Sequence, residues 1–290
     1  MTGHEPGEAQ PDVAESSRRS LFRLGAGAGA AALGGAAAMR GALGTWPGLV
    51  WPGARDRDEI GRWAHRKHRP VASEVRWCFE TDERVVALTF DDGPDPLLTP
   101  GVLDALGRHG AVATFFVLGR LAAEQPALVR RMVAEGHEVG NHSWTHDRFA
   151  DMDAERTDRE LTETQAALER ITGTSSSWFR PPRGQVTGAS VSAAARSKMD
   201  VALWTQRFGV EEPEDRPAVD DLCDRMQPGD IVLFHDGVAE SAEETTSSEP
   251  SERRRRRTTD AGALDELLGR LVSDGWEFAT LSGLAAATRP

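Results

Sequence analysis

Short apolar runs alternate with helical patterns along the chain from Arg84 onward. The runs are typical of strands and occupy residues 85–90, 113–119, 137–143, 177–182, 200–205, 230–236 and 277–284. Patterns with helical spacing lie between them, near residues 99–109, 124–135, 153–172, 188–198, 218–226 and 260–274. This alternation predicts parallel strands joined by helical crossovers, which occur in both α/β barrels and doubly wound sheets.

Polar side chains stand at the C-terminal ends of several expected strands. Asp91 and Asp92 come at the end of the first strand, and His142, Arg180 and His235 come at the ends of three others. In a barrel the C-terminal strand ends converge on one face, where catalytic residues collect, whereas a doubly wound sheet spreads them along an edge. We therefore expect an α/β fold, and within that class a (β/α) barrel of about seven parallel strands.

The composition limits the classes of function. With 290 residues, 39% of them hydrophobic, the chain can form one sizeable core with additional segments. A formal net charge of −12 argues against a nucleic-acid binder, which would normally present a basic face. Neither Cys78 nor Cys223 lies in a CxxC motif or a Cys/His cluster, so a thiolate metal site is disfavoured. Whether the two cysteines form a disulfide is left open.

The N-terminal segment has the pattern of an export signal. Residues 17–23, SRRSLFR, precede a weakly apolar run rich in Gly and Ala. This resembles a twin-arginine signal and predicts an exported protein, extracellular or associated with the cell envelope, that contacts the twin-arginine export machinery. The run is too short and too rich in Gly for a membrane-spanning helix. We assign residues 1–38 to the signal peptide and residues 39–80 to a linker and N-terminal lead-in.

The main domain is expected over residues 81–285, with one interruption. Residues 239–259 are of low complexity, with an acidic block followed by five consecutive arginines. A solvated loop is the favoured interpretation, and a basic patch for an anionic cell-wall polymer is the alternative.

A candidate metal site lies in NHSWTH, residues 141–146. His142 and His146 are four residues apart, a spacing that can bring two imidazoles to one metal ion. Ser143 stands where a zincin has Glu, so this is not a zincin. The Asp91-Asp92 pair can supply both missing parts, one carboxylate as third ligand and the other as general base. Two histidines and one aspartate suit zinc, with cobalt or manganese as alternatives.

Four motifs together resemble the polysaccharide deacetylases with a NodB homology domain, carbohydrate esterase family 4. They are TFDDGPD (89–95), HSWTH (142–146), RPPRG (180–184) and IVLFHD (231–236). The resemblance covers about residues 81–285 and implies a distorted (β/α) barrel. It also implies a metal-dependent hydrolase that removes acetyl groups from an extracytoplasmic polysaccharide, with N-acetyl groups favoured and O-acetyl groups as the alternative. The products would be acetate and a free amino sugar.

The resemblance also implies roles for individual residues. Asp91 would be the catalytic base and His235 the general acid, and Asp92, His142 and His146 would hold one divalent metal ion.

The third motif and one tryptophan supply the remaining candidates. By the same resemblance, Arg180 would orient Asp91 and stabilise its charge, and a backbone N–H of the motif would bind the oxyanion. Pro182 and Arg183 are candidate substrate-binding residues, and Arg183 stands where the family usually has an aromatic residue. Trp144 is a candidate sugar platform, with core packing as its alternative.

The fourth motif departs from the family pattern. In LWTQRFGVEEPED (203–215), Arg207 stands about where the family has an Asp that holds the acid His235. Trp204, in the same segment, is interpreted as a core residue, with a sugar platform as the alternative.

The expected substrate is peptidoglycan or a chitin-like glycan, with acetyl-xylan and exopolysaccharide also open, and the protein is expected to be a monomer. Two other functions stay open: a glycoside hydrolase that uses Asp91 with another carboxylate, and a catalytically weakened carbohydrate-binding relative. Chelator sensitivity separates the first from a deacetylase, and acetate release excludes the second.

Overall fold

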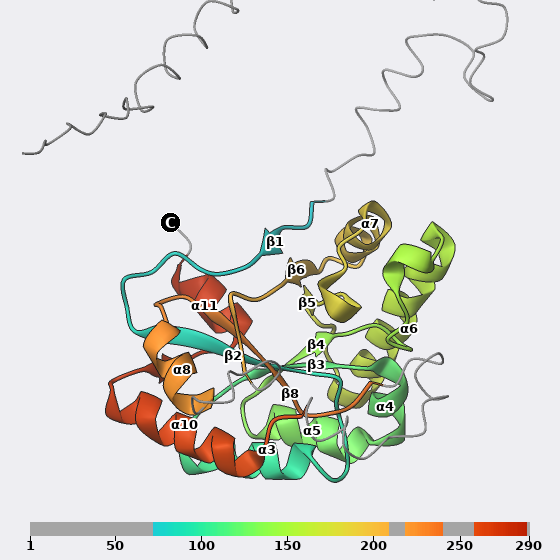
Figure 1. Cartoon of the computed structure of the whole chain (residues 1–290). Helices are drawn as coiled ribbons and strands as arrows, with labels where there is room; N and C mark the ends of the chain where they lie inside the picture. The colour runs from blue at the N-terminus through green and yellow to red at the C-terminus, as the bar shows by residue number, and fades with distance from the viewer. Residues whose placement is uncertain (1–71, 209–217, 240–257, 289–290) are drawn as a thin grey trace, which may run out of the picture. The chain divides into compact units, whose positions relative to one another are not determined.

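A computed structural model describes residues 72–208, 218–239 and 258–288 (Figure 1). The predicted signal peptide, most of the lead-in and most of the low-complexity loop lie outside these ranges, so their assignments stay predictions. The whole of the described structure belongs to one compact unit, residues 70–290.

The strands in these ranges form one sheet in which every strand-to-strand pairing is parallel. They are β1 (Val75–Arg76), β2 (Val85–Asp91), β3 (Thr114–Val117), β4 (Glu138–Asn141), β5 (Trp178–Phe179), β6 (Asp200–Ala202), β7 (Gln206–Arg207), β8 (Ile231–His235) and β9 (Glu277–Phe278). Their order across the sheet is β1-β6-β5-β4-β3-β2-β8-β7, and β9 pairs separately with β2. The sheet curls into part of a barrel (Figure 1), and β1 and β7 stand at the two ends of the strand order.

Helices connect successive strands and cover the sheet, with α3, α5 and α10 along its lower side in Figure 1. The helices are α3 (Thr99–Arg108), α4 (Gly119–Glu124), α5 (Pro126–Ala134), α6 (Ala154–Thr172), α7 (Gly188–Arg196), α8 (Ala218–Arg225), α10 (Ala261–Ser273) and α11 (Leu281–Ala287). Two short 3-10 turns, η1 (Phe149–Asp151) and η2 (Pro182–Gly184), complete the set. None of the helices in the described ranges is long and apolar enough to cross a membrane.

The expected barrel is confirmed, and each of the seven expected strands is present. The two additional strands, β1 and β7, have only two residues each. Two expected strands were too long: residues 177–182 are a strand only over β5, with η2 starting at Pro182, and residues 277–284 are a strand only over β9, with α11 following. The Thr280 hydroxyl accepts a hydrogen bond from the backbone N–H of Gly283 and so caps the first turn of this helix.

The domain also begins earlier than residue 81. Strand β1 pairs with β6, and Phe79 is buried in the core, so these residues of the expected lead-in are part of the folded domain.

The core fixes the strands that carry the polar motifs. Phe90 on β2 stacks on Phe115 of β3 and on Phe234 of β8, with ring centroids 5.0 and 5.1 Å apart, and all three side chains are fully buried. Central parallel strands are covered on both faces, which explains why these runs are almost continuously apolar. The stacking holds β2 and β8 in a register that pairs Asp91 with His235.

Candidate active site

The predicted site residues lie at the carboxyl ends of neighbouring strands. Asp91 ends β2 and stands opposite His235, the last residue of β8. His142 directly follows β4, and Arg180 directly follows β5. Because all strands are parallel, these ends lie on one face of the barrel, as the sequence predicted.

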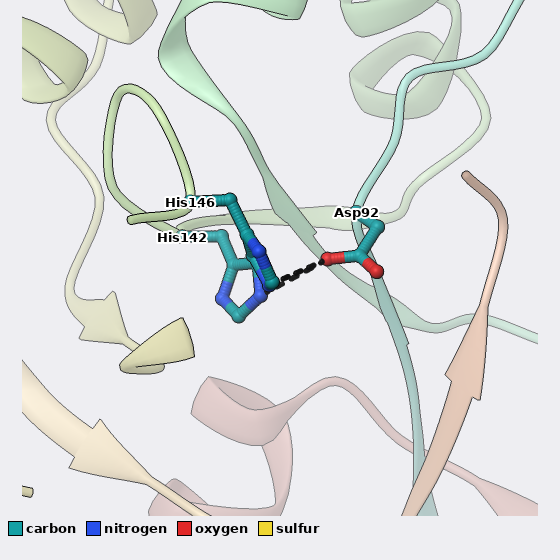
Figure 2. A group of neighbouring side chains, drawn as sticks. All are labelled: Asp92, His142 and His146. Carbon is teal, nitrogen blue, oxygen red and sulfur yellow. Dashed lines mark ion pairs between the residues drawn. The ribbon is translucent and has the colours of Figure 1, made fainter. Parts of the chain in front are cut away.

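The three predicted metal ligands form a compact group. One donor atom each from Asp92, His142 and His146 lies within 4.8 Å of the other two, and all three residues are buried. Figure 2 shows the two imidazole rings facing the carboxylate. Oδ1 of Asp92 is 3.2 Å from Nε2 of His146 and 3.4 Å from Nε2 of His142.

The hydrogen bonding of His142 shows that this group suits a cation. Its Nδ1 lies 2.7 Å from the carbonyl oxygen of Arg180, and only a protonated nitrogen can donate there. In the neutral ring, Nε2 therefore presents a lone pair to Asp92, whose buried Oδ1 has no hydrogen-bond partner. Both atoms then offer an electron pair and no proton lies between them, so a metal ion placed there would be bound by both. The hydrogen bond to the carbonyl of Arg180 would fix the orientation of the His142 ring.

Burial and the neighbouring charges keep Asp92 ionised and His146 neutral, and these are the forms in which a carboxylate and an imidazole bind a metal ion. Burial opposes the charge on Asp92, but the neighbouring histidines outweigh it and lower the pKa of this carboxyl below its ordinary value. Burial lowers the pKa of His146 to about 4, so its ring is neutral at neutral pH. For His142, burial is outweighed by Asp91 and Asp92, whose charges raise its pKa. A proton thus competes with the metal ion mainly at His142.

Two of these predicted ligands have an uncommon backbone conformation. The φ angles of Asp92, Ser143 and His146 are 75°, 74° and 68°, a region that residues other than glycine rarely adopt. Such conformations persist only where the surroundings hold them, and they cluster at functional sites.

The support for the second motif comes from two residues that the sequence analysis missed. The Asn141 side chain accepts a hydrogen bond from the backbone N–H of Ser143. The Glu160 carboxylate, reaching from α6, accepts from the backbone N–H groups of both Trp144 and Thr145. Glu160 follows Trp144 by sixteen residues, so no local spacing marked it as part of the site.

Asp91, the predicted base, is held by a fully buried arginine. Nη1 of Arg180 donates to Oδ1 of Asp91 at 2.8 Å and to Oγ1 of Thr89 at 2.7 Å. The other guanidinium nitrogens donate to the carbonyl oxygens of Ala202 and Leu203. One carboxylate oxygen of Asp91 is thereby fixed, and Oδ2 lies on the other side, 3.7 Å from Nε2 of His142.

A cavity of about 190 Å³ opens above these groups. Five of the residues predicted to act in catalysis or metal binding line it: Asp91, Asp92, His142, His146 and His235. Arg183, Trp204 and Arg207 complete its polar and aromatic wall. Trp204, which we interpreted as a core residue, therefore faces the cavity as well as packing on the core.

The other two substrate-binding candidates do not lie among the described residues of the cavity wall. Pro182 is buried in η2. The ring of Trp144 lies so close to Gly119 that a Cβ there would be 2.4 Å from it, and Thr164 of α6 crowds the same point.

Comparison with known proteins places the chain in a family. The polysaccharide deacetylase family model matches residues 79–202. The peptidoglycan-N-acetylmuramic acid deacetylase PdaC of Bacillus subtilis is 32% identical over 224 residues, which cover 75% of this chain and 42% of PdaC. The peptidoglycan-N-acetylglucosamine deacetylase of Bacillus cereus is 31% identical over 231 residues, which cover 76% of this chain and 96% of that protein. The chain belongs to the polysaccharide deacetylase family.

A solved structure supports the same assignment. Bacillus subtilis PdaA, a family 4 carbohydrate esterase, matches with a TM-score of 0.61 at 28% identity, over 74% of this chain and 86% of that chain. The match confirms the fold and the class of hydrolase that the four motifs predicted. The chain nevertheless spans only about two fifths of the length of PdaC.

His235 of this family member differs from the family pattern in its surroundings. Its Nδ1 is buried and has no hydrogen-bond partner in the described part of the chain. Its backbone N–H is bound by the hydroxyl of Thr259. Arg207, at about the place of the expected Asp, pairs through its strand with Leu233 and lines the same cavity.

Asp236, in the last motif of this deacetylase domain, was not singled out from the sequence. It is almost fully buried, and burial raises the pKa of its carboxyl to about 7. The Thr99 hydroxyl donates to its Oδ2 at 2.6 Å. The carboxylate lies against Gly93, where a Cβ would be 2.3 Å away. Asp236 therefore joins the last motif to the turn that follows Asp92.

Proposed function

We propose that the chain is a metal-dependent deacetylase that hydrolyses the acetamide of an N-acetylated sugar in an extracytoplasmic polysaccharide. One observation carries the proposal: a single cavity holds an oriented carboxylate, Asp91, beside the converging donor atoms of Asp92, His142 and His146. The names of the relatives support peptidoglycan as the substrate class, with a chitin-like glycan as the alternative.

The metal site has a defined part in this proposal. Asp92, His142 and His146 would hold one divalent ion, for which zinc is the favoured identity and cobalt or manganese the alternatives. Such an ion activates water and polarises a carbonyl group as a Lewis acid.

Asp91 is the group in this cavity best placed to take the proton of the attacking water. Arg180 binds one of its oxygens and so fixes the direction of the other. A positioned base of this kind contributes about 10²–10⁴-fold in rate. His235, paired in register with Asp91 on the neighbouring strand, is the candidate acid that protonates the leaving amine.

The third motif is expected to supply a backbone N–H to the oxyanion. Arg183 of this motif lines the cavity with its backbone held at φ 59°, and its N–H is the candidate donor. One donor of this type stabilises a transition state by roughly 3–4 kcal/mol.

The geometry weakens the case for a glycoside hydrolase. Its two carboxyl groups would stand about 5–9 Å apart across the sugar ring. Here Asp91 and Asp92 are adjacent, and Asp92 turns toward two histidines instead of toward a second face of a substrate.

The decisive experiment is acetate release from a panel of peptidoglycan, chitooligosaccharides and acetylated xylan. Acetate should appear with the metal-loaded protein, stop with a chelator and return with zinc, and about one ion per chain should be bound. Asp91→Asn serves as the control with reduced turnover. New reducing ends without acetate would favour a glycosidase, and neither product would favour a carbohydrate-binding protein.

Export through the twin-arginine route is part of the proposal and rests on residues 17–23. Replacement of Arg18 and Arg19 by Lys should leave the precursor inside the cell. Normal export of that variant would show that the export machinery does not recognise the arginine pair.

A further inference from the structure

A second cavity, of about 670 Å³, is lined by residues of α3, of the end of α5 and of the segments that lead into β3 and β4. These segments enter the strands at their amino ends, so the cavity lies at the opposite end of the sheet from the catalytic groups. Figure 1 shows α3 and α5 along the lower side of the sheet. Cavities that bind small molecules usually have about 300–1,000 Å³, so this one has room for a ligand.

One buried polar atom in this cavity has no partner. The side chain of His137 is 2% exposed, and its Nδ1 accepts a hydrogen bond from the backbone N–H of Ala113 at 3.2 Å. Burial lowers the pKa of His137 and favours the neutral ring, whose one proton is therefore on Nε2. Among the described residues, Nε2 is buried without a hydrogen-bond partner. Contact with Phe115 and the bond from Ala113 account for the ring and for Nδ1, but not for this N–H.

A carboxylate oxygen lies near this N–H without reaching it. Oε1 of Glu135 accepts from Nε of Arg131 at 2.7 Å, and Oε2 of Glu135 lies 3.9 Å from Nε2 of His137. That gap is too long for a direct hydrogen bond. One oxygen atom at about 2.8 Å from both atoms would join them at an angle of about 90°. Such an atom must accept from Nε2–H and donate to Oε2, and a hydroxyl group does both.

The charges around the cavity favour a neutral ligand. Asp104 and Glu135 are balanced by Arg108 and Arg131, and Arg131 is bound to both acids. A metal ion would need a lone pair on Nε2 of His137, where the ring has its proton. An anion at the same atom would lie close to the carboxylate of Glu135, which repels it.

Apolar and open surface lies beside this polar pair. Leu103, Ala111 and Val112 line the cavity, and a Cβ on Gly107 or Gly110 would meet nothing within 4 Å. A sugar ring presents hydroxyl groups and apolar C–H groups on one rigid unit. It therefore matches a wall on which a few polar groups stand on an apolar surface.

We propose that this cavity is a second carbohydrate-binding site, in which a hydroxyl of a neutral sugar accepts from Nε2 of His137 and donates to Oε2 of Glu135. Because the cavity is separate from the catalytic one, the bound sugar belongs to another chain, or to a distant part of the chain whose acetyl group reacts. The site thus holds the domain on a polysaccharide and leaves its active site open. The proposal does not depend on the chemistry of the catalytic cavity.

Cellohexaose is the probe, because its β-1,4-linked rings have hydroxyl groups but no acetamide. In nuclear magnetic resonance of the full chain, it should shift the ring N–H signal of His137 and the methyl signals of Leu103 and Val112. The expected Kd is on the order of 1 mM, in line with a few hydrogen bonds on an open surface. No shift of these signals up to about ten times that concentration would mean that the cavity holds only water, and would overturn the proposal.

Variants at exposed positions show whether the polar pair causes the binding. Glu135→Gln keeps an oxygen for Arg131 but places an amide N–H₂, which cannot accept, toward the ligand, so affinity should fall about tenfold. Gly107→Gln adds a side chain at the open wall of the cavity and should also weaken binding. Glu169→Gln is the matched control, because it removes a negative charge from the exposed surface of α6, and it should keep the affinity. Wild-type affinity in both cavity variants would refute the site.

A further variant separates the two cavities. If Trp204→Ala abolishes the binding of cellohexaose and Glu135→Gln does not, the sugar is bound in the catalytic cavity and the second site is refuted. Glu135→Gln should keep acetate release from a soluble chitooligosaccharide but adsorb less to insoluble polysaccharide. Absence of acetate release from the wild type would refute the proposed function, and the binding measurements would still decide the second site.

Discussion

Replacing Asp91 and Asp92 by asparagine, one at a time, distinguishes the predicted general base from the predicted metal ligand. Oδ1 of Asp91 is 2.8 Å from Arg180, whereas Oδ1 of Asp92 faces both histidine ligands. Asp91→Asn should therefore keep the metal ion and lose the proton acceptor. The expected loss is about 10²–10⁴-fold in kcat, or roughly 3–5 kcal/mol in barrier height.

The same substitution also has a cost in stability. Removal of one partner from a buried ion pair destabilises a fold by about 3–5 kcal/mol. That figure is an upper bound for Asp91→Asn, because the amide oxygen still accepts a hydrogen bond and Arg180 keeps its bonds to Thr89 and to two carbonyl oxygens. Urea unfolding must therefore accompany the kinetics, so that a loss of fold is not counted as a loss of catalysis.

The assay is activity against zinc concentration, together with metal content after dialysis. Asp92→Asn should bind metal more weakly, and excess zinc should partly restore its turnover. Asp91→Asn should hold a full equivalent of metal and gain nothing from more. The reverse pattern would mean that the two roles are exchanged. Full activity in both variants would show that this cavity is not the active site.

Two further substitutions test the support of the site. Gly237→Ala would place a Cβ 2.4 Å from the backbone carbonyl oxygen of Asp92, so metal affinity should fall, whereas Gly107→Ala, with nothing within 4 Å, should leave it unchanged. Equal affinities in both would contradict the contact. In Asp236, the native pKa of about 7 lies above the ordinary 3.8, so the native state binds the extra proton and loses stability as pH rises from about 4 to 7. Asp236→Asn has no such titration, so between pH 4 and 8 its free energy of unfolding should rise relative to that of the wild type by up to about 4 kcal/mol, measured by urea unfolding without metal. A difference in unfolding free energy that does not change with pH would refute this.

The central strands could be predicted because their signal is local. Residues 85–90, 113–119 and 230–236 are apolar runs long enough to be recognised, since both faces of a central parallel strand are covered. Strands β1 and β7 have two residues each, too few to show a period, and exist only through pairing with β6 and β8. The start of α11 depended on the cap at Thr280, which an expected strand across the same residues concealed.

The site was predictable where its residues stand in short motifs. His142 and His146 are separated by one turn's spacing, and the structure brings both to Asp92. Residues that support the site from a distance were not predictable, such as Thr99, which binds Asp236 across 137 positions. The two tryptophans show the same limit. The ring of Trp144 packs against Gly119 and α6, and Trp204 is the tryptophan that lines the cavity; the spacing of the residues in the sequence revealed neither fact.

The departure in the fourth motif yields a prediction about the candidate acid. Nδ1 of His235 has no hydrogen-bond partner in the described structure, and Arg207 lines the cavity at about the place where the family has an Asp. A carboxylate that accepts a hydrogen bond from one ring nitrogen holds an imidazole in the orientation and tautomer that proton transfer needs. Arg207→Asp, which restores the family pattern, should therefore raise kcat for acetate release. Saturation kinetics of this variant and the wild type on one acetylated glycan measure the change, and an equal kcat would show that His235 does not need such a partner.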